Sequence, residues 1–444
     1  MAHEYNATTA RLLAVRSSIL GTENGRGSEG VLNCLHRLGS VQIDTISVVE
    51  RAHNHTLGSR VTSYRPSHLA LLEQPPMRII EYWSHAAAYL PIEEYRFCLP
   101  RMERVKNEGH EWFRAESNAI AYVRDRIRSE GPLRARDFEA KFASPRGWWD
   151  WKPAKIALEY LFHSGEFISI GRKNFQKVYD LAERHLPANL DLSIPTAREM
   201  ARHHLDHAIS ALGIFTRDEI GYMRKDGLKE MNTELSARIE AKNLIELQLS
   251  YSDENYISPK ALTSAMPAEP NKNKIYYANP EILESVRLKM RCSRAFILSP
   301  FDPLVIDRRR LYRLFGIDYR IECYIPEAKR RFGYFPLLCL YVAADGLVCF
   351  PALLDARANR AMGKLDIKRL ALGSIEGRQA LSKRSSIARA LVEEIKRFAT
   401  RNGTAQIELE KLDCYDGAFE KEFRRLLKTV SKGPADAEID SGIR

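Results

Sequence analysis

Apolar residues recur at helical spacing in the first part of the chain and at strand spacing in its last part. Residues 3–20 and 31–38 are predicted helices, and Gly39 ends the second one. Residues 117–190 then read as three helices and a pair of strands, and residues 195–275 repeat three helices and a strand. Three helices followed by a small wing of strands is the order of a winged helix, a relative of the helix-turn-helix.

A short strand, "SVQID", follows Gly39. Successive side chains of a strand point to opposite faces, so Gln42 and Asp44 should project together while Val41 and Ile43 face the other way. A solvated strand edge explains such a pair by itself, and Asp44 is also placed to cap a helix in the following "TISVVE" segment. Capping does not exclude a chemical role for the same carboxylate.

Strands dominate from Ala295 onward, with turn signals at Gly333 and at residues 344–346 between them. The predicted strands are "AFILSPFDPLV", "YRIECYIP", "FPLLCLYVA", "GLVCFPALLDA" and "GKLDIKRLAL". A helix, "SIARALVEEIKRFAT", and a strand, "AQIELEKL", close the fold. This pattern favours a small β-barrel, with a compact sheet as the alternative.

The fold class predicted from these patterns is α+β, with tandem winged-helix domains followed by a small C-terminal β-barrel. At 444 residues the chain is too long for one hydrophobic core. The predicted units are a winged-helix-like N-terminal domain at 1–115, a second winged helix at 116–190, a third at 191–280, the barrel with its helix at 281–432, and a disordered tail at 433–444.

The charge of the chain is concentrated in one segment. The formal net charge is +11, and residues 287–384 alone contain 20 Lys and Arg against 9 Asp and Glu. Basic residues gain free energy by displacing counterions from phosphates, so the segment indicates a polyanionic partner. An anionic membrane surface is the rival reading, but no strongly amphipathic basic helix supports it.

Cysteine usage and hydropathy indicate the compartment. The seven cysteines are odd in number and scattered, without a CxxC pair, which argues for a reducing environment and against a disulfide or zinc framework. The chain has no run of eighteen apolar residues, and its N-terminus lacks the apolar core of a signal peptide. We therefore predict a cytoplasmic protein with no membrane segment.

Two local motifs carry more than one interpretation. In "HHLDH", His203 and His207 lie one helical turn apart, which suits a metal, but no third ligand at a known spacing is visible, so a polar helix face is favoured and no metal is predicted. In "WWDW", Trp148, Trp149 and Trp151 either stack on nucleobases or fill a domain junction, and packing is favoured.

A third motif, "KRRFGY" at 329–334, mixes basic and aromatic residues at a predicted turn. A phosphate contact and a solvated turn remain equally open for it. The chain contains no P-loop, HExxH, GxSxG or kinase motif, and no cofactor is predicted.

Three segments together resemble a known family. They are "LGSVQIDTI…RAHNHTLGSR", "EYWSHAAAYLP" and "SPFDPLVIDRRRLYRLFGIDYRIECYIPEAKRRFGY". In this order they resemble the bacterial winged-helix DNA glycosylases of the YcaQ/AlkZ type, over nearly the whole chain. The resemblance implies three winged helices followed by a β-barrel, and double-stranded DNA carrying alkylated purines as the partner.

The family has two branches, which carry Q-x-Q or Q-x-D at the catalytic position. Gln42-Ile43-Asp44 is Q-x-D, so the chain resembles the YcaQ-like branch. The resemblance implies excision of cationic N7-alkylpurines in base excision repair, including the unhooking of alkyl interstrand crosslinks. Ala87 stands where a larger or acidic residue is expected, which bears on lesion choice.

The chemistry of such a lesion matches this residue pair. An N7-alkylated purine is already cationic and departs without protonation, so the remaining need is support for an oxocarbenium-like sugar and a positioned water. Asp44 is suited to stabilise the cation and polarise the water, and the neutral amide of Gln42 to orient it. No lysine for Schiff-base chemistry lies in the motif, so we predict a monofunctional enzyme.

Further residues are expected to contact DNA. Arg51, His53 and Arg60 should hold phosphates beside the lesion, and Trp83 and His85 should wall the pocket, with a buried hydrogen-bonded corner as the alternative for His85. The remaining predicted DNA contacts are Lys329, Arg330 and Arg331. A crosslinked base cannot leave the duplex fully, which favours an open cleft over a closed pocket.

Two other functions remain possible from the sequence. A non-catalytic winged-helix transcriptional regulator would bind one DNA sequence tightly and release no base. A protein that binds anionic membrane surfaces would bind vesicles as strongly as DNA at the same salt concentration. For the glycosylase we expect the chain to act as a monomer.

Overall fold

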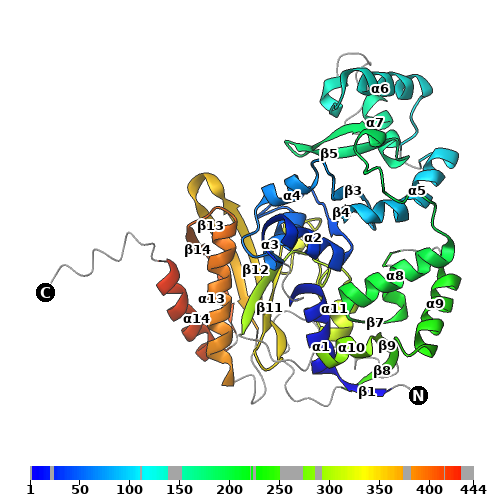
Figure 1. The fold of residues 1–444 in the computed structure, drawn as a ribbon. Helices are drawn as coiled ribbons and strands as arrows, with labels where there is room; N and C mark the ends of the chain where they lie inside the picture. The colour runs from blue at the N-terminus through cyan, green and yellow to red at the C-terminus, as the bar shows by residue number, and fades with distance from the viewer. Residues whose placement is uncertain are drawn as a thin grey trace.

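The structure is a computed structural model, shown as a ribbon in Figure 1. It describes residues 3–20, 25–110, 113–138, 153–220, 222–223, 227–250, 274–285, 293–373, 382–414 and 416–431. The three tryptophans of "WWDW" and the predicted tail at 433–444 lie outside these residues. No helix among them is long and apolar enough to cross a membrane.

The first unit surrounds a three-stranded sheet in the order β2-β4-β3. Its elements are α2 (Gly27–Leu38), β2 (Val41–Gln42), α3 (Ala52–Arg60), α4 (Pro66–Leu72), β3 (Ile79–Trp83), β4 (Ala87–Pro91), the 3-10 helix η2 (Ile92–Glu94) and α5 (Tyr95–Glu108). Gly39 ends α2 with a φ of 71°, a conformation that favours glycine, as expected from the sequence. This turn brings the chain directly into β2.

The second unit has the expected order of elements. It contains α6 (Ser117–Glu130), the 3-10 helix η3 (Ala135–Phe138), α7 (Pro153–His163), and the hairpin β5 (Phe167–Lys173) and β6 (Gln176–Leu181), followed by the 3-10 turn η4 (Ala182–Arg184). The hairpin turn reaches the first unit, because Arg172 of β5 pairs with the buried Glu81 of β3 at 2.6 Å. The term winged helix remains an interpretation of this element order.

The third unit takes one strand from the start of the chain. Its elements are α8 (Ala197–Leu212), β7 (Ile214–Phe215), the 3-10 helix η5 (Arg217–Glu219), α9 (Leu228–Glu240), β8 (Ile245–Ser250) and β9 (Tyr276–Ala278). The strand β1 (His3–Asn6) pairs with β8 in parallel, giving the sheet order β1-β8-β9-β7. The boundaries at 115, 190 and 280 remain predictions, but contacts of the described chain cross all of them.

The C-terminal unit is built on the largest sheet. Its elements are α10 (Pro280–Ser285), β10 (Arg294–Leu298), α11 (Arg308–Phe315), the 3-10 helix η6 (Glu327–Lys329), β11 (Leu337–Val342), β12 (Val348–Asn359), the 3-10 turn η7 (Arg360–Met362), β13 (Lys364–Leu372), α13 (Arg384–Arg401), β14 (Gln406–Leu409), β15 (Leu412–Cys414) and α14 (Gly417–Ser431). The strand path is β10-β11-β12-β13-β14, and β15 also pairs with β13.

The predicted barrel is wrong, because these described strands form an open path and both faces of the sheet are covered. Leu337, Cys339 and Tyr341 of β11 join the core beneath α13 and α14. Leu338 and Leu340, which point the other way, join a second core with α1 and α11. Among the described strands no pairing closes the path between β10 and β14, so the compact sheet that the sequence left as the alternative describes this unit.

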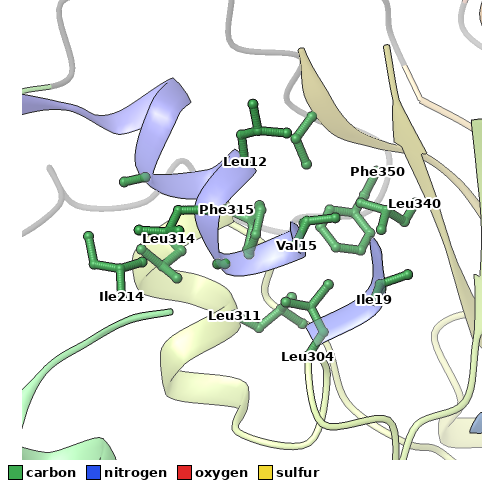
Figure 2. Close-up of a cluster of buried hydrophobic side chains, with 14 of the residues drawn as sticks. Leu12, Val15, Ile19, Ile214, Leu304, Leu311, Leu314, Phe315, Leu340 and Phe350 are labelled. Atoms are coloured by element: carbon green, nitrogen blue, oxygen red, sulfur yellow. The ribbon is translucent and has the colours of Figure 1, made fainter. Parts of the chain in front are cut away.

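The N-terminal helix belongs to that second core. The helix α1 (Ala7–Val15) continues as the π-helical turn η1 (Arg16–Leu20) and lies between β7, α11 and the C-terminal sheet. Figure 2 shows the side chains that meet there, which include Leu12, Val15, Ile19, Ile214, Leu304, Leu311, Leu314, Phe315, Leu340 and Phe350. The start of the chain therefore joins the third unit to the C-terminal unit.

One predicted strand is also absent. "YRIECYIP" at 319–326 forms turns that lead into η6, with no strand among these residues. The buried Glu322 of this segment accepts the backbone N–H groups of Arg331, Phe332 and Gly333 at 2.8–3.1 Å, so the segment is folded against the loop that follows it.

Candidate active site

The chain leaves β2 at the predicted pair of polar residues. Val41 and Ile43 are buried, whereas Gln42 and Asp44 are half-buried, so the alternation predicted from the sequence is confirmed. The hydrogen bond from Ile43 N–H to Ala87 O, at 2.8 Å, extends the ladder past the end of the strand. Both polar side chains therefore retain access to solvent beside β4.

Asp44 does not cap a helix, because residues 45–50 form bends. Its Oδ1 accepts the N–H of Ile46 at 2.8 Å, which closes a turn typical of aspartate. Burial raises the pKa of the Asp44 carboxyl above its ordinary value, and the Ile46 N–H and the positive charge of Arg51 oppose this shift only in part. The carboxylate is thus less hydrated than a surface aspartate, which strengthens its interaction with a nearby cation.

Gln42 is oriented by the turn between β3 and β4. His85 Nε2 lies 3.1 Å from Gln42 Oε1, and the imidazole edge meets the ring of Tyr222 at 5.6 Å between centroids. With Nε2 protonated, His85 donates to the amide oxygen and directs the amide nitrogen of Gln42 away from itself. The structure thus brings together Gln42 and His85, and their contact joins the two motif segments.

Arg51 closes the other side of the turn. Its guanidinium donates to Thr45 O at 3.1 Å and lies 3.4 Å from the ring centre of Phe175, at the tip of the β5–β6 hairpin. Arg172 approaches the same ring at 4.4 Å. Two cations in contact with one aromatic ring hold the hairpin of the second unit against the loop that follows Asp44.

His53 does not lie where a phosphate could reach it. The residue is 6% exposed and packs between the rings of Tyr89 and Phe175. Burial, with the charges of Arg172 and Arg51, lowers its pKa to about 3, so the imidazole is neutral at physiological pH. A buried neutral imidazole cannot supply the positive charge expected of it, and its predicted phosphate role is wrong.

Arg60 is the second correction among the predicted DNA contacts. Its side chain is 1% exposed and forms a two-pronged ion pair with Asp302, with N–O distances of 2.7 and 2.9 Å. Its Nε also donates to Ser18 O at 2.7 Å. This arginine therefore joins α3 to the C-terminal unit instead of facing a bound duplex.

The loop from 318 to 336 is folded by buried carboxylates. Burial alone would raise the pKa of Glu322, but three backbone N–H groups lower it further than burial raises it, and the net shift is downward. Asp355 accepts the N–H groups of Tyr334 and Phe335 at 2.9 and 3.1 Å. Gly333 is required there, because a Cβ at this position would meet Asp355 Oδ2 at 2.1 Å. Glu322 and Asp355 are thus turned inward, whereas Asp318 and Glu327 of the loop are exposed.

The basic side chains of this loop are turned outward, as predicted for a DNA contact. Lys329 and Arg331 are exposed, and Arg330 is half-buried with its guanidinium 5.0 Å from the ring centre of Tyr334. The loop adjoins the candidate site, because the negative charge of Asp44 helps to raise the pKa of both Cys323 and Tyr324, after burial. Asp44, of the predicted catalytic pair, therefore lies near this loop.

A family model for AlkZ-like DNA glycosylases matches residues 35–401, most of the chain. The chain belongs to the AlkZ-like DNA glycosylase family. It is therefore a hydrolase of N-glycosidic bonds with DNA as its substrate, as the resemblance implied.

A solved structure of the family has a similar fold. The DNA glycosylase AlkZ of Streptomyces sahachiroi matches with a TM-score of 0.54 at 12% sequence identity, over 92% of this chain and 100% of that one. At this identity the match concerns the arrangement of elements alone. The family model includes Gln42, Asp44, His85 and the loop at 318–336, so the site described above lies wholly within the matched region.

Trp83 of this AlkZ-like chain lines a different cavity from the one expected. The cavity has a volume of about 360 Å³, and its lining includes Trp83, His110, Phe113 and His163. Arg101 lies 5.2 Å from the Trp83 ring centre. Trp83 and His85 come from one hairpin but line different surroundings, so a shared pocket wall is not what the structure forms.

Several residues near the site were not singled out from the sequence. Tyr324 is 75% exposed beside Asp44, Tyr222 contacts His85, and Phe175 supports Arg51. No local pattern marks them, since each reaches the AlkZ-like site from a distant part of the chain. The one sequence signal in this region was "KRRFGY", which lies in the same loop as Tyr324.

Proposed function

We propose that this AlkZ-like glycosylase excises cationic N7-alkylpurines from double-stranded DNA and unhooks alkyl interstrand crosslinks. The observation that supports the proposal is the arrangement at Asp44. A partly desolvated carboxylate lies beside a neutral amide and an outward-facing basic loop. This site is suited to a substrate whose reacting centre becomes positive while its backbone is negative.

The leaving group explains why a carboxylate and an amide suffice. An N7-alkylated purine carries its positive charge before the bond breaks, so no proton has to be supplied to it. Charge then develops on the sugar, where ionised Asp44 stabilises the oxocarbenium-like transition state and polarises the attacking water. Gln42, oriented by His85, positions that water or the sugar without adding charge.

The same residues favour monofunctional hydrolysis. Lyase chemistry requires an amine that forms a Schiff base with the sugar. Residues 38–60, which hold the Q-x-D motif, contain no lysine. Water is therefore the proposed nucleophile, and an abasic site the proposed product.

The geometry also favours an open cleft for DNA. Asp44 lies half-buried at the end of a strand, next to an exposed loop that carries Lys329 and Arg331. Loop cations bind phosphates, and Tyr324 offers an exposed aromatic face to a partly unstacked base. An open site accepts a base still tied to the opposite strand, as crosslink unhooking requires.

The test is base release from two substrates. Purified protein is incubated with duplex DNA that carries N7-methylguanine, and with a duplex that carries one N7-linked crosslink. Wild type should release the modified base from both. Asp44→Asn should lower the rate at least about 100-fold and leave DNA affinity within a few fold.

Three results would overturn or limit this proposal. Tight binding of a single palindromic sequence with no base release from either substrate would favour a regulator. Release of N7-methylguanine without any action on the crosslink would limit the proposal to monoadducts. Vesicle binding as strong as DNA binding at the same salt would favour the anionic-surface function.

A further inference from the structure

A histidine pair on α8 meets a carboxylate from another element. His203 and His207 lie one helical turn apart, with their ring centres 4.3 Å from each other. Both Nε2 atoms point to Glu94, at 2.9 Å for His203 and 3.0 Å for His207. Glu94 ends the 3-10 helix η2, just before α5. The third group that the sequence spacing did not reveal is thus supplied by the fold.

We propose that Glu94, His203 and His207 bind one divalent transition-metal ion of the zinc type. Two imidazoles and one carboxylate are a common zinc ligand set, which leaves the fourth position for water. The ligand atoms of the three residues all lie within 4.8 Å of one another. No role of this cluster in glycosidic chemistry is needed for the proposal, which is independent of the proposed function.

The distances match a site that closes on a metal. Zinc binds imidazole nitrogen and carboxylate oxygen at roughly 2.0–2.2 Å, so tetrahedral ligand atoms are roughly 3.3 Å apart. His203 Nε2 lies 2.9 Å from Glu94 Oε2 and His207 Nε2 lies 3.0 Å from Glu94 Oε1, so each imidazole needs to move away from its own carboxylate oxygen by only a few tenths of an ångström. Each metal bond replaces an N–H···O hydrogen bond along the direction that the imidazole nitrogen already takes.

The surroundings hold the imidazoles in place. Phe97 stacks on His203 with 3.6 Å between ring centres and 6° between planes. His207 packs against Gly39, where a Cβ would meet its Nδ1 at 1.9 Å. The glycine that ends α2 is therefore also what leaves room for a ligand. Packing of this kind preorganises metal ligands, because the rings lose little further freedom on binding.

The charge balance also favours a cation. Glu94 takes its two described hydrogen bonds from imidazoles and none from a guanidinium. Arg96, two positions along the chain, pairs instead with Asp191 at 3.1 Å and Glu199 at 2.8 Å. The side chain of His207 is 32% exposed, which gives an ion and its water a path from solvent. With neutral imidazoles, the cluster carries one negative charge and two nitrogen donors.

Such an ion would join two units of the fold. The helix α8 lies between α2 and α9 in Figure 1, and Glu94 belongs to the segment that connects β4 to α5. A metal bound to both restrains the third unit against the first. Because a metal that binds the folded chain alone adds stability through mass action, the melting temperature should rise with zinc.

Metal binding to the full chain without a histidine tag tests the proposal. After dialysis against a chelator, Co²⁺ should give the strong visible absorption of a tetrahedral site, and Zn²⁺ should displace it at one ion per chain. His207→Ala and Glu94→Gln should weaken binding at least about 100-fold, since each removes a ligand. His204→Ala, a neighbouring histidine outside the cluster, is the matched control and should bind as wild type does.

Three results would overturn the proposal. They are the absence of tetrahedral Co²⁺ absorption in wild type, ligand variants that bind Zn²⁺ as tightly as wild type, and a melting temperature that zinc leaves unchanged. Each would identify the cluster as a hydrogen-bonded junction. Far-UV circular dichroism checks folding, and Glu94→Gln, which keeps hydrogen-bonding capacity, decides the matter if a histidine variant does not fold.

Discussion

The segment from Leu38 to Arg60 contains two charged groups that the fold treats in opposite ways. Asp44 is half-buried, keeps no ion-pair partner at contact distance among the described salt bridges, and has a raised pKa. Arg60 is buried and fully paired with Asp302. The charge proposed for chemistry is thus left incompletely neutralised, whereas the charge that joins two units is matched by a partner on both of its terminal nitrogens.

The largest effect is expected from breaking the buried pair. Arg60→Met leaves Asp302, which has no exposed surface, as an unpaired buried carboxylate. Unfolding free energy should fall by about 3–5 kcal/mol. Chemical denaturation measures it, and Arg60→Met with Asp302→Leu should recover part of the loss. Arg51→Met, which changes an incompletely buried arginine, is the control and should cost about 1 kcal/mol or less.

This experiment also separates the two roles that Arg60 has been given. A phosphate ligand would lose DNA affinity at unchanged stability when substituted. If Arg60→Met has the stability of wild type and binds DNA more weakly, the assembly role assigned to it here is wrong.

The second effect concerns the neutral member of the site. Gln42→Leu removes the amide that His85 orients and should lower base release roughly 100-fold, the usual cost of losing one oriented polar group. Single-turnover kinetics measure the chemical step apart from binding. Gln406→Leu, at an exposed glutamine on β14, is the matched control with an unchanged rate expected. Equal rates for wild type and Gln42→Leu would remove Gln42 from the chemistry.

Substitutions in the basic loop should have a smaller effect, which appears in the salt dependence of DNA affinity. Lys329→Gln or Arg331→Gln removes one proposed phosphate contact and should reduce the slope of log affinity against log salt by about 1. Fluorescence anisotropy at several salt concentrations measures the slope. Lys368→Gln, whose lysine pairs with Glu410 on the surface of the sheet, should leave the slope unchanged. A slope that no loop substitution alters would place the DNA elsewhere.

The smallest expected effect is a pH-dependent change in melting temperature when Asp44 is substituted. Because burial raises the folded pKa of Asp44 above its unfolded value, the ionised carboxylate costs stability at neutral pH, and this cost disappears as pH falls below the unfolded pKa. Asp44→Asn should therefore melt at a slightly higher temperature than wild type at pH 7, with the difference vanishing in acid. Calorimetry at both pH values measures it. A lower melting temperature at pH 7 would make Asp44 a structural group.

The charged residues of the C-terminal segment, residues 287–384, are also divided between buried, paired groups and exposed ones. Some of its acidic residues are internal: Asp302 pairs with Arg60, and Glu322 and Asp355 bind backbone N–H groups. Among its basic residues Arg310 is internal too, buried against Glu219. The net charge therefore overstated the binding surface, and the outward cations of the 318–336 loop are a small part of the total.

Local pattern was sufficient for the features that depend on neighbours in sequence. The alternation in "SVQID" predicted that Gln42 and Asp44 share a face, and Gly39 was placed correctly at the end of a helix. Both follow from backbone geometry, which acts over a few residues. The barrel prediction failed for a reason visible in the sequence: "LLCLYV" is apolar at every position, so both faces of that strand must be covered.

What the sequence by itself determined was therefore the periodicity, the helix ends, the Q-x-D pair and the resemblance to a family. Only the tertiary structure decided which side chain each charged or polar residue contacts. Arg60 meets Asp302 across 242 positions, and Glu94 reaches His207 across 113. Pairings at such separation depend on how whole units pack, and nothing in the local residue pattern distinguishes an arginine that will be buried from one that will face DNA.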